Sequence, residues 1–576
     1  MKKKLLALSV LAAISSQANA FQFDTGDDWA IRWDNTFKAN VMTRVAKQDD
    51  DVVTPQAGAS WELADDADLS VDRSGGGLVS TRIDVISEMD VIWKDNFGFR
   101  VSGSAWYDPQ YSSSNNDHPS DRSLSWASPS ADVGDYNHEA KDLHYAGGEL
   151  LDAFVFGNFD FGDMALGVRA GRHTIYWGNG LLTNGALHGF GGSMAPIDFN
   201  KALSVPGSEA KELFMPSGKV SSVLQLTDNL TLNAYYGYEY VAYRVPEDGT
   251  YWSPAESLSE NSEFAAVLPA GSPLAAALGI PDGFRGGYKP RGYSEEGGDY
   301  GVNVQYFIEP WGLEVSAIYI NHTDMNLNGL VGAPGSPGTP RPGDGGAGDF
   351  LLSKGAIAIG ESKWIHKEDI SVYGISLAKE LAGISVGVDL VRREDQALAP
   401  QLSAALFLAP GADITSFDGD DYPGAVGDTY HVNINGIGLL NNQWGLWDGG
   451  SWILEATFSQ LDSCNENCQL TDVRVSEGRW ISQVAGIFSP TWYQVRPGWD
   501  MSIPMAVNYT IDGEKAPYSF AGDEEAGSAS LGVRVDIDQQ WKIDLAYNIR
   551  FGPVLAGIGG LLKDRDNVSL TVKRTW

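Results

Sequence analysis

The sequence predicts an all-β fold, a transmembrane antiparallel β-barrel of about 18 strands (about 16 is the alternative count) with long extracellular loops. Three observations indicate it. Many segments alternate apolar with polar residues, short connections alternate with long ones, and the chain ends on an alternating segment that closes with Trp576. A soluble β-sandwich would explain the final segment, but it gives no reason for the regular alternation of connection lengths.

The first predicted strand, residues 30–43, shows the alternation clearly. Its apolar face carries Ile31, Trp33, Phe37, Ala39 and Val41. Its other face carries Arg32, Asp34, Thr36, Lys38 and Asn40. Burying such a charged face in a sandwich would be costly, whereas a barrel turns it toward a wet lumen and its apolar face toward lipid.

The same alternation recurs along the chain, for example in residues 79–93 and 541–551. Tight turns are expected at residues 94–96, 161–163, 228–229, 309–312, 381–383, 496–498 and 538–540. Long connections are expected at residues 46–77, 109–149, 178–218, 244–297, 323–368, 394–427, 462–479, 511–526 and 553–566. Short periplasmic turns and long external loops are typical of outer-membrane barrels, and an even strand count leaves both termini in the periplasm.

Residues 1–20 have the features of a cleaved export signal. Three lysines precede a short apolar run, and Ala18-Asn19-Ala20 forms a small-residue cleavage site. No later run reaches the roughly 18 apolar residues of a transmembrane helix. We therefore expect a signal peptide at 1–20 and a single barrel domain at 21–576, in the outer membrane of a Gram-negative bacterium and in contact with its lipid.

Composition and charge narrow the classes of function. Aromatic residues make up 11% of the chain and the mean hydropathy is −0.19, which suits a barrel with aromatic girdles better than a helical membrane protein. Without the three signal lysines, 37 Lys and Arg face 75 Asp and Glu, a charge of −38 that excludes nucleic acid as a partner.

Cys464 and Cys468 are the two cysteines of the chain. In an oxidising compartment, a small disulfide at a loop tip is favoured over a zinc site, because two thiols without nearby histidines would underfill zinc. We expect no metal site, no cofactor and no catalytic residues. The sequence contains no G-x-S-x-G, H-E-x-x-H or Walker motif. His173 lies beside two arginines in Arg169-Ala170-Gly171-Arg172-His173-Thr174, and a structural role on the lumen wall is favoured over a catalytic one for it.

Charged residues on the lumen face come mostly from strands near the two termini, while the middle strands supply mostly neutral groups. Closure joins the first and last strands, so these charges are expected to form one sector. The predicted solute path is lined by Arg32, Lys38, Arg82, Asp84, Glu88, Arg100, Arg169, Arg534 and Arg550. The alternative is that paired lumen charges only stiffen the barrel and hold a plug.

Two long connections, 178–218 and 263–284, are too apolar for solvated loops, because exposed apolar patches of that size favour aggregation. They are expected to fold into the mouth or lumen, or to cap the barrel by packing on each other. In 178–218 the predicted constriction residues are Leu181, Leu182, Leu187, Phe190, Met194 and Phe199.

Several strings resemble one family over nearly the whole chain after the signal. They include Arg32-Trp33-Asp34-Asn35-Thr36, residues 77–84, 97–108, 151–158 and 169–173, Pro490-Thr491-Trp492-Tyr493-Gln494 and residues 564–570. The family is domain of unknown function 1302, a group of Gram-negative outer-membrane β-barrel proteins. The resemblance implies an outer-membrane protein, and a gene setting with RND-type exporters and hydrophobic compounds, but it supplies no ligand or catalytic residues.

The leading hypothesis is an outer-membrane channel or carrier for a small hydrophobic or amphipathic organic solute, gated by 178–218, with Arg82, Arg100 and Arg169 along the path. The alternative is a scaffold without transport that docks a periplasmic partner protein or an envelope or efflux complex. An outer-membrane enzyme is a third hypothesis that no motif favours.

Overall fold

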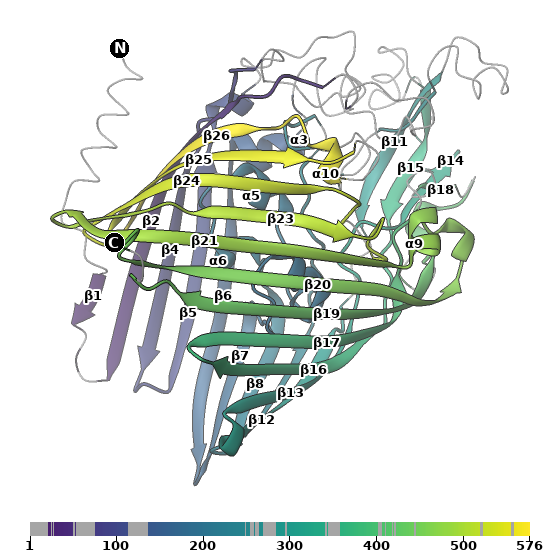
Figure 1. Ribbon diagram of the computed structural model, residues 1–576. Coiled ribbons are helices and arrows are strands. Elements are labelled where there is room, and N and C mark those ends of the chain that lie inside the picture. Colours follow the sequence, from purple (N-terminus) through teal and green to yellow (C-terminus); the bar gives the residue numbers. More distant parts are fainter. Residues whose placement is uncertain are drawn as a thin grey trace.

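The computed structural model describes residues 21–24, 26, 28–49, 52, 75–112, 136, 138–247, 249–253, 259, 264–268, 284–293, 297–339, 343, 357–400, 406–408, 411–417, 419, 422–442, 445–518, 522–553 and 558–576. These residues form a closed antiparallel barrel of 18 strands (Figure 1). The predicted fold class and the larger of the two strand counts are therefore confirmed.

The barrel strands follow chain order around the wall. They are β2 (Trp29–Arg44), β4 (Ile83–Trp93), β5 (Phe97–Tyr107), β6 (Ala146–Phe161), β7 (Met164–His173), β8 (Ser217–Thr227), β9 (Leu230–Gly237), β12 (Tyr300–Ile308), β13 (Leu313–His322), β16 (Ile370–Leu381), β17 (Ile384–Ala397), β19 (Val426–Leu439), β20 (Gly449–Glu466), β21 (Trp480–Arg496), β22 (Trp499–Ser502) with β23 (Met505–Asp512), β24 (Gly527–Ile537), β25 (Trp541–Phe551) and β26 (Asn567–Thr575). β22 and β23 are two parts of one strand, because both pair with β21 and β24.

The barrel closes between its first and last strands. β2 pairs with β4 on one side and with β26 on the other, where Thr36 lies opposite Thr575. β1 (Phe21–Asp24) adds to β2 opposite residues 30–33, beyond the point where β26 ends. Arg574 stacks over Trp541 at 4.9 Å, so its charge lies beside interfacial aromatic rings.

Tight turns join strands at the end of the barrel that holds the C-terminus (Figure 1). Lys94 and Asp95 have φ of 51° and 58°, and Asp538 and Gln539 have φ of 49° and 59°. Such paired positive values are those of the central residues of a type I′ turn, whose twist matches the right-handed twist of the flanking strands. The predicted turns lie at strand ends, while the connection at residues 440–448, between β19 and β20, was missing from the prediction.

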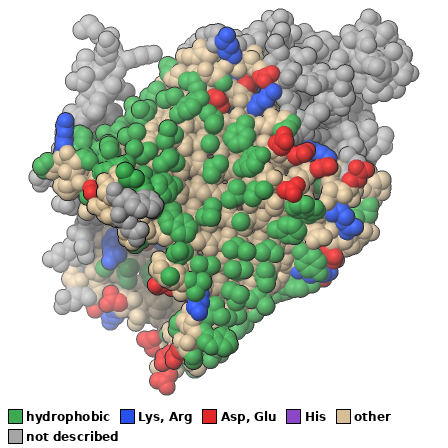
Figure 2. Space-filling view, in the orientation of Figure 1, with side chains coloured by type: hydrophobic (Ala, Val, Ile, Leu, Met, Phe, Trp, Pro, Cys, Tyr) green, Lys and Arg blue, Asp and Glu red, His purple; other side chains and the backbone are tan. Residues whose placement is uncertain are grey.

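The outer face of the barrel is apolar. Figure 2 shows hydrophobic side chains spread over the strands, with charged side chains toward the rims. Leu390, Leu454, Leu531 and Leu545 are among the exposed apolar residues of this face. A row of aromatic rings runs along the turn end. The ring centroids of Trp29 and Trp93 lie 6.2 Å apart and those of Trp93 and Phe97 lie 6.0 Å apart, and the row continues from Phe97 to Phe159. This exterior places the barrel in the outer membrane.

The long connections carry a second sheet at the end opposite the C-terminus (Figure 1). Its order is β10 (Phe264–Leu268), β11 (Phe284–Tyr293), β15 (Ile357–Trp364), β14 (Leu330–Pro334) and β18 (Leu406–Leu408). The apolar connection 263–284 thus contributes β10 to this sheet, and residues 269–283 lie outside the described residues. Short elements complete the connections: β3 (Leu78–Ser80), η2 (Pro109–Tyr111), α3 (His138–Ala140), η5 (Lys141–Tyr145), η7 (Glu309–Trp311), η9 (Ile414–Ser416), η11 (Cys468–Leu470), α9 (Val473–Gly478) and α10 (Ile558–Leu561). None of the helices in the described part of the chain has the length and apolarity needed to cross a membrane.

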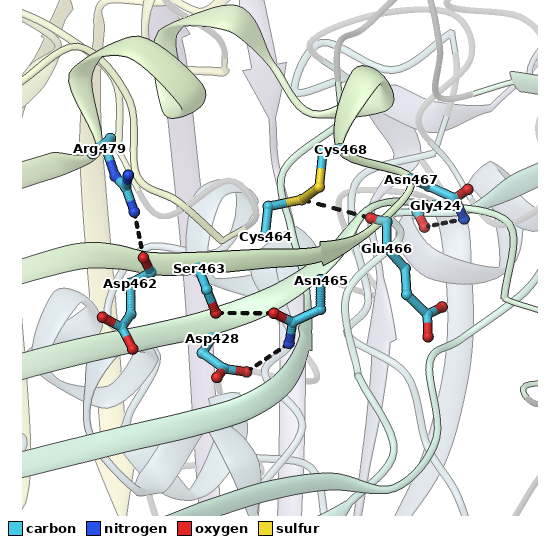
Figure 3. The surroundings of a disulfide bond; sticks show 10 residues. All are labelled: Gly424, Asp428, Asp462, Ser463, Cys464, Asn465, Glu466, Asn467, Cys468 and Arg479. Atoms are coloured by element: carbon cyan, nitrogen blue, oxygen red, sulfur yellow. Dashed lines mark hydrogen bonds between the residues drawn. A yellow bond between two sulfur atoms is a disulfide. The ribbon is translucent and has the colours of Figure 1, made fainter.

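The two cysteines form a disulfide at the tip of β20, where Cys464 is joined to Cys468 (Figure 3). The ring it closes is small, and its neighbours tie it to the adjacent strand. Asn465 Nδ2 donates to Asp428 Oδ1 of β19 at 3.0 Å, and Asn467 Nδ2 donates to the Gly424 carbonyl at 3.1 Å. The disulfide therefore fastens this loop tip to the rim of the barrel.

An arginine on the lipid face should destabilise the barrel, whereas one on the lumen face should not. Leu545 and Val223 are both exposed, at 49% and 51%, but Leu545 lies on the lipid face and Val223 shares the lumen face of Asn233. We expect Leu545→Arg to lower the free energy of unfolding by about 2–4 kcal/mol in urea titrations of lipid-folded protein. Val223→Arg should lower it by under about 1 kcal/mol. Equal losses would contradict the assigned faces.

Candidate functional site

The connection between β7 and β8, residues 174–216, folds into the barrel and is named the inserted loop here. It contains α4 (Thr183–His188), η6 (Gly191–Ser193), α5 (Phe199–Ser204) and α6 (Ala210–Leu213). Its glycines permit close approach to the wall, since a Cβ at Gly185 would collide with the carboxylate of Glu455. The part predicted to fold inward, 178–218, thus lies against the lumen face of the barrel.

Apolar packing fixes one side of the inserted loop. Phe190 and Met194 are buried against lumen-facing residues of four strands: Tyr235 of β9, Ile318 and Ile320 of β13, Val372 of β16 and Val391 of β17. Leu187 is buried against Ile197, Tyr243 and Ile481. These three predicted constriction residues hold the inserted loop to the wall.

A buried carboxylate of β20 holds the start of α4. Glu455, 1% exposed, accepts the backbone N–H groups of Leu181 at 2.7 Å, Gly185 at 2.8 Å and Leu182 at 3.2 Å. The first N–H groups of a helix have no partner within it, and they are the positive end of its dipole. Glu455 therefore supplies both the acceptor and the charge that this helix end requires.

Two further charges of β17 bind the backbone of the inserted loop. Asp389 accepts the N–H of Asn179 at 2.8 Å and the hydroxyl of Ser376 at 2.6 Å. Arg393 Nη2 donates to the carbonyls of Leu187 at 2.7 Å and Gly189 at 2.8 Å. Both side chains are fully buried. The wall thus satisfies donors and acceptors of an irregular segment that has no ladder partners of its own.

Histidines extend this contact to β19 and β21. His188 of α4 hydrogen-bonds through Nε2 to Gln483 Oε1 at 3.0 Å, and its Nδ1 lies 2.6 Å from Ser459 Oγ. His431 shares the same serine at 2.8 Å. His173 also has both ring nitrogens in contact, with the Gly171 carbonyl at 2.9 Å and with Ser221 Oγ at 2.7 Å. These contacts are those of structural histidines.

On the side of the termini, the predicted charged sector also contacts the inserted loop. Lys38 Nζ lies 2.8 Å from Glu212 Oε1, and ion pairs also join Lys573 to Glu209 and Lys211 to Glu88. Within the wall, Arg82 pairs with Asp84 at 2.8 Å and Arg100 with Glu88 at 2.7 Å. Lys38, Arg82, Asp84, Glu88 and Arg100 therefore take part in ion pairs that brace the wall and the inserted loop.

A four-membered ion-pair cluster fixes α5. Arg244, in the connection after β9, lies 2.7 Å from Asp198 and 2.9 Å from Glu149, and Lys201 of α5 pairs with Glu149 as well. Burial lowers the pKa of Arg244, but the carboxylates of Asp198 and Glu149 outweigh it and raise that pKa above its usual value. Asp198 also caps α5, accepting the N–H of Lys201 at 2.7 Å.

The opposite side of the inserted loop does not pack closely on the wall, and a cavity of about 970 Å³ lies there. The inserted loop lines it with apolar residues that include Leu181, Leu182, Ile197, Phe199, Leu203 and Leu213. The barrel lines it with small polar residues of β23 to β26 that include Asn508, Ser528, Ser530, Asn548, Ser569 and Thr571. The barrel side also includes Ala485, Ile487, Ala506 and Ala546, so the cavity has an apolar side and a side on which small polar groups lie among apolar ones.

Arg534 and Arg550 are the two predicted path residues that line this cavity. Arg534 pairs with Asp544 at 2.8 Å, and the guanidinium of Arg550 lies 4.8 Å over the ring of Trp252. Leu181, Leu182 and Phe199 of the predicted constriction also line it. Arg32 and Arg169 are exposed on the lumen face of other strands, with Arg169 5.6 Å over the ring of Phe154.

The expectation that charges come mostly from the terminal strands needs correction. Lys219 of β8, Asp389 and Arg393 of β17, and Glu455 of β20 are buried charges on middle strands. Each is a charged residue at an inward position of an alternating strand, so a search for that pattern in every strand could have found them. Among the described residues, no group of three or more His, Cys, Asp or Glu side chains could hold a metal ion.

Removing the charge of Glu455 should loosen the start of α4. In Glu455→Gln an amide nitrogen faces backbone donors, so we expect the amides of Leu181, Leu182 and Gly185 to exchange hydrogen about tenfold faster or more. Hydrogen–deuterium exchange of peptides covering 178–190 measures this. Glu314→Gln, at an exposed position of β13, is the matched control. Unchanged exchange in Glu455→Gln would contradict the anchoring role.

Comparison with known proteins identifies the family. No curated protein matches the sequence. Solved structures that are similar include OccAB4 of Acinetobacter baumannii, with 8% identity, 96% of this chain and 99% of that chain covered, and a TM-score of 0.40. OccAB1 of the same organism has 12% identity, with 97% of this chain and 98% of that chain covered and a TM-score of 0.40. OccK1 (OpdK) of Pseudomonas aeruginosa has 8% identity, with 95% of this chain and 98% of that chain covered and a TM-score of 0.39. The model of the family described as "Protein of unknown function (DUF1302)" matches residues 1–576, and the chain therefore belongs to that family.

Proposed function

We propose that this protein is an outer-membrane channel or carrier that moves small hydrophobic or amphipathic organic solutes past the inserted loop. The observation that carries the proposal is the two-sided cavity. Its volume, about 970 Å³, lies in the range of sites that enclose a small organic molecule. A molecule of this kind could bury its apolar body against the inserted loop, while its polar groups form hydrogen bonds with the small polar residues of the barrel wall.

The position of the cavity supports transport over storage. It is lined by Arg534 and Asp544 near the turn end of β24 and β25, and by Arg550 near their loop end. The six residue-to-residue steps from Asp544 to Arg550 span about 20 Å along the strand, since a strand rises about 3.4 Å per residue. Because strands in this class are tilted by about 35–45°, this length covers roughly 15 Å of an apolar height of about 25 Å.

The packing of the inserted loop supports a gating role for it. Its far side is fixed by the core of Phe190 and Met194 and by Glu455 and Asp389, while its cavity side carries Leu181, Leu182 and Phe199. Rotation of these side chains would change the width of the path without breaking the buried contacts of the loop backbone. The solute passes between the inserted loop and β23 to β26.

Filling the cavity should stop passage. We expect expression of the protein to speed uptake of N-phenyl-1-naphthylamine, a hydrophobic fluorescent probe, into cells, and Ser530→Trp to return uptake to the vector baseline. Ser530 lines the cavity, whereas Leu531, the next residue of β24, is exposed on the lipid face. Leu531→Trp is therefore the matched control and should keep the wild-type rate.

Heat-modifiable electrophoretic mobility would establish that all three proteins are folded in the membrane in equal amounts. Wild-type uptake no faster than that of the vector would overturn the proposal. Equal uptake by wild type and Ser530→Trp would show that the path lies elsewhere in the barrel.

A further inference from the structure

We propose that the cavity selects amphipathic anions, with the acid group of the solute held at Arg550 and its apolar body against the inserted loop. This inference rests on the proposed function and names the charge of the solute. Carboxylate, sulfonate and phosphate groups share the required chemistry, which is a compact anion that accepts several hydrogen bonds.

The charges that line the cavity are unbalanced. Three charged side chains line it, and two of them, Arg534 and Asp544, form an ion pair with each other. The third, Arg550, has no carboxylate oxygen of the described residues within 4.0 Å of its guanidinium. Asp566, which does not line the cavity, accepts the backbone N–H of Arg550 at 3.0 Å, and its carboxylate attracts the guanidinium without forming an ion pair with it. The cavity lining therefore carries one positive charge without an ion-pair partner among the described residues, in a chain whose net charge is −35.

This arginine differs from the lumen cations that hold the inserted loop. Lys38, Lys201 and Lys573 each contact a carboxylate, and Arg393 donates to two loop carbonyls. Each of these cations therefore has at least one oxygen acceptor within the protein. The contacts of the Arg550 side chain within the described residues are with an aromatic face, which holds a guanidinium in position but accepts none of its N–H groups in the plane.

The groups beside Arg550 add donors. Trp252, 1% exposed, lines the same cavity, and its indole Nε1 has no hydrogen-bond partner among the described residues. An indole N–H only donates, as does a guanidinium. Asn548 already uses Nδ2 on Asn567 Oδ1 at 3.0 Å. The unmet demand at this end of the cavity is for an acceptor, and an anion supplies the strongest one.

The apolar part of the site begins directly beside this group. Leu203 of α5 packs on the cluster of Met42, Val79, Tyr251 and Trp252. From Leu203 the cavity wall continues along the inserted loop to Phe199 and Leu181. A solute whose acid group reaches Arg550 would therefore place its hydrocarbon or aromatic body on this side and leave water on the side of Ser528 and Ser530. A cation would meet Arg550 with nothing to balance it.

Three probes with the same apolar body separate the possibilities: 4-phenylbutyrate, 4-phenylbutan-1-ol and 4-phenylbutylamine. Binding would be measured by isothermal titration calorimetry of the purified protein in nanodiscs, with empty nanodiscs subtracted. We expect the carboxylate to bind about tenfold more tightly than the alcohol, as for one charge-assisted hydrogen-bonded pair, and the amine to bind most weakly.

Arg550→Gln should reduce the preference for the carboxylate over the alcohol to below about twofold, because the charge is lost while polarity is kept. Arg550→Lys should retain most of that preference, and binding of the alcohol by Arg550→Gln at the wild-type affinity would show that this variant is folded. Arg496→Gln is the matched control, since Arg496 also stacks on a tryptophan, Trp499, at 5.6 Å but lies at the turn end outside the cavity.

The outcomes distinguish the two proposals. Equal binding of carboxylate and alcohol to the wild type, or an unchanged preference in Arg550→Gln, would overturn the anion site and leave the channel for amphipathic solutes standing. Failure of all three probes to bind, together with wild-type uptake of N-phenyl-1-naphthylamine at the vector baseline, would overturn both.

Discussion

The hydrogen bonds between buried wall charges and the backbone of the inserted loop are the constraint on which the rest of this structure depends. An irregular segment inside a barrel leaves N–H and C=O groups without ladder partners, and each unmet group costs free energy. Glu455 accepts from three such N–H groups, and Arg393 donates to two carbonyls. The same contacts stabilise the charges, because a buried carboxylate or guanidinium requires hydrogen-bonding partners.

The placement of these anchors explains the shape of the lumen. Apolar contacts and carboxylates bind the inserted loop to β9, β13, β16, β17 and β20, and ion pairs bind it to β2, β4 and β26. The inward positions of β24 and β25 carry charged residues toward the strand ends, among them Arg534, Asp544 and Arg550, and short residues between them, namely Ser530, Gly532, Ala546 and Asn548. The cavity lies in front of this stretch because its side chains are small.

The barrel could be predicted from the sequence because its signal is local. Alternation fixes which face of a strand each residue shares, and strand count follows from turns and long connections. Lys38, Arg82 and Glu88 were placed on the lumen face for this reason, and they lie there. Their partners could not be predicted in the same way. Glu455 meets Gly185 across 270 positions of the chain, and no periodicity relates an inward carboxylate to the loop backbone that it binds.

The same argument explains why the candidate site has no sequence motif. Its polar side is a set of short side chains on β23 to β26, and such side chains line the polar lumen of any barrel of this class. Its apolar side is part of the inserted loop, which alone would describe a plug. Arg550 and Arg393 are both inward arginines, and alternation treats them alike. They differ because the inserted loop presents two carbonyls to Arg393, whereas it presents Leu203 beside Trp252 near Arg550. The position of one loop thus decides which of these two inward arginines is bound to loop carbonyls and which lines the cavity.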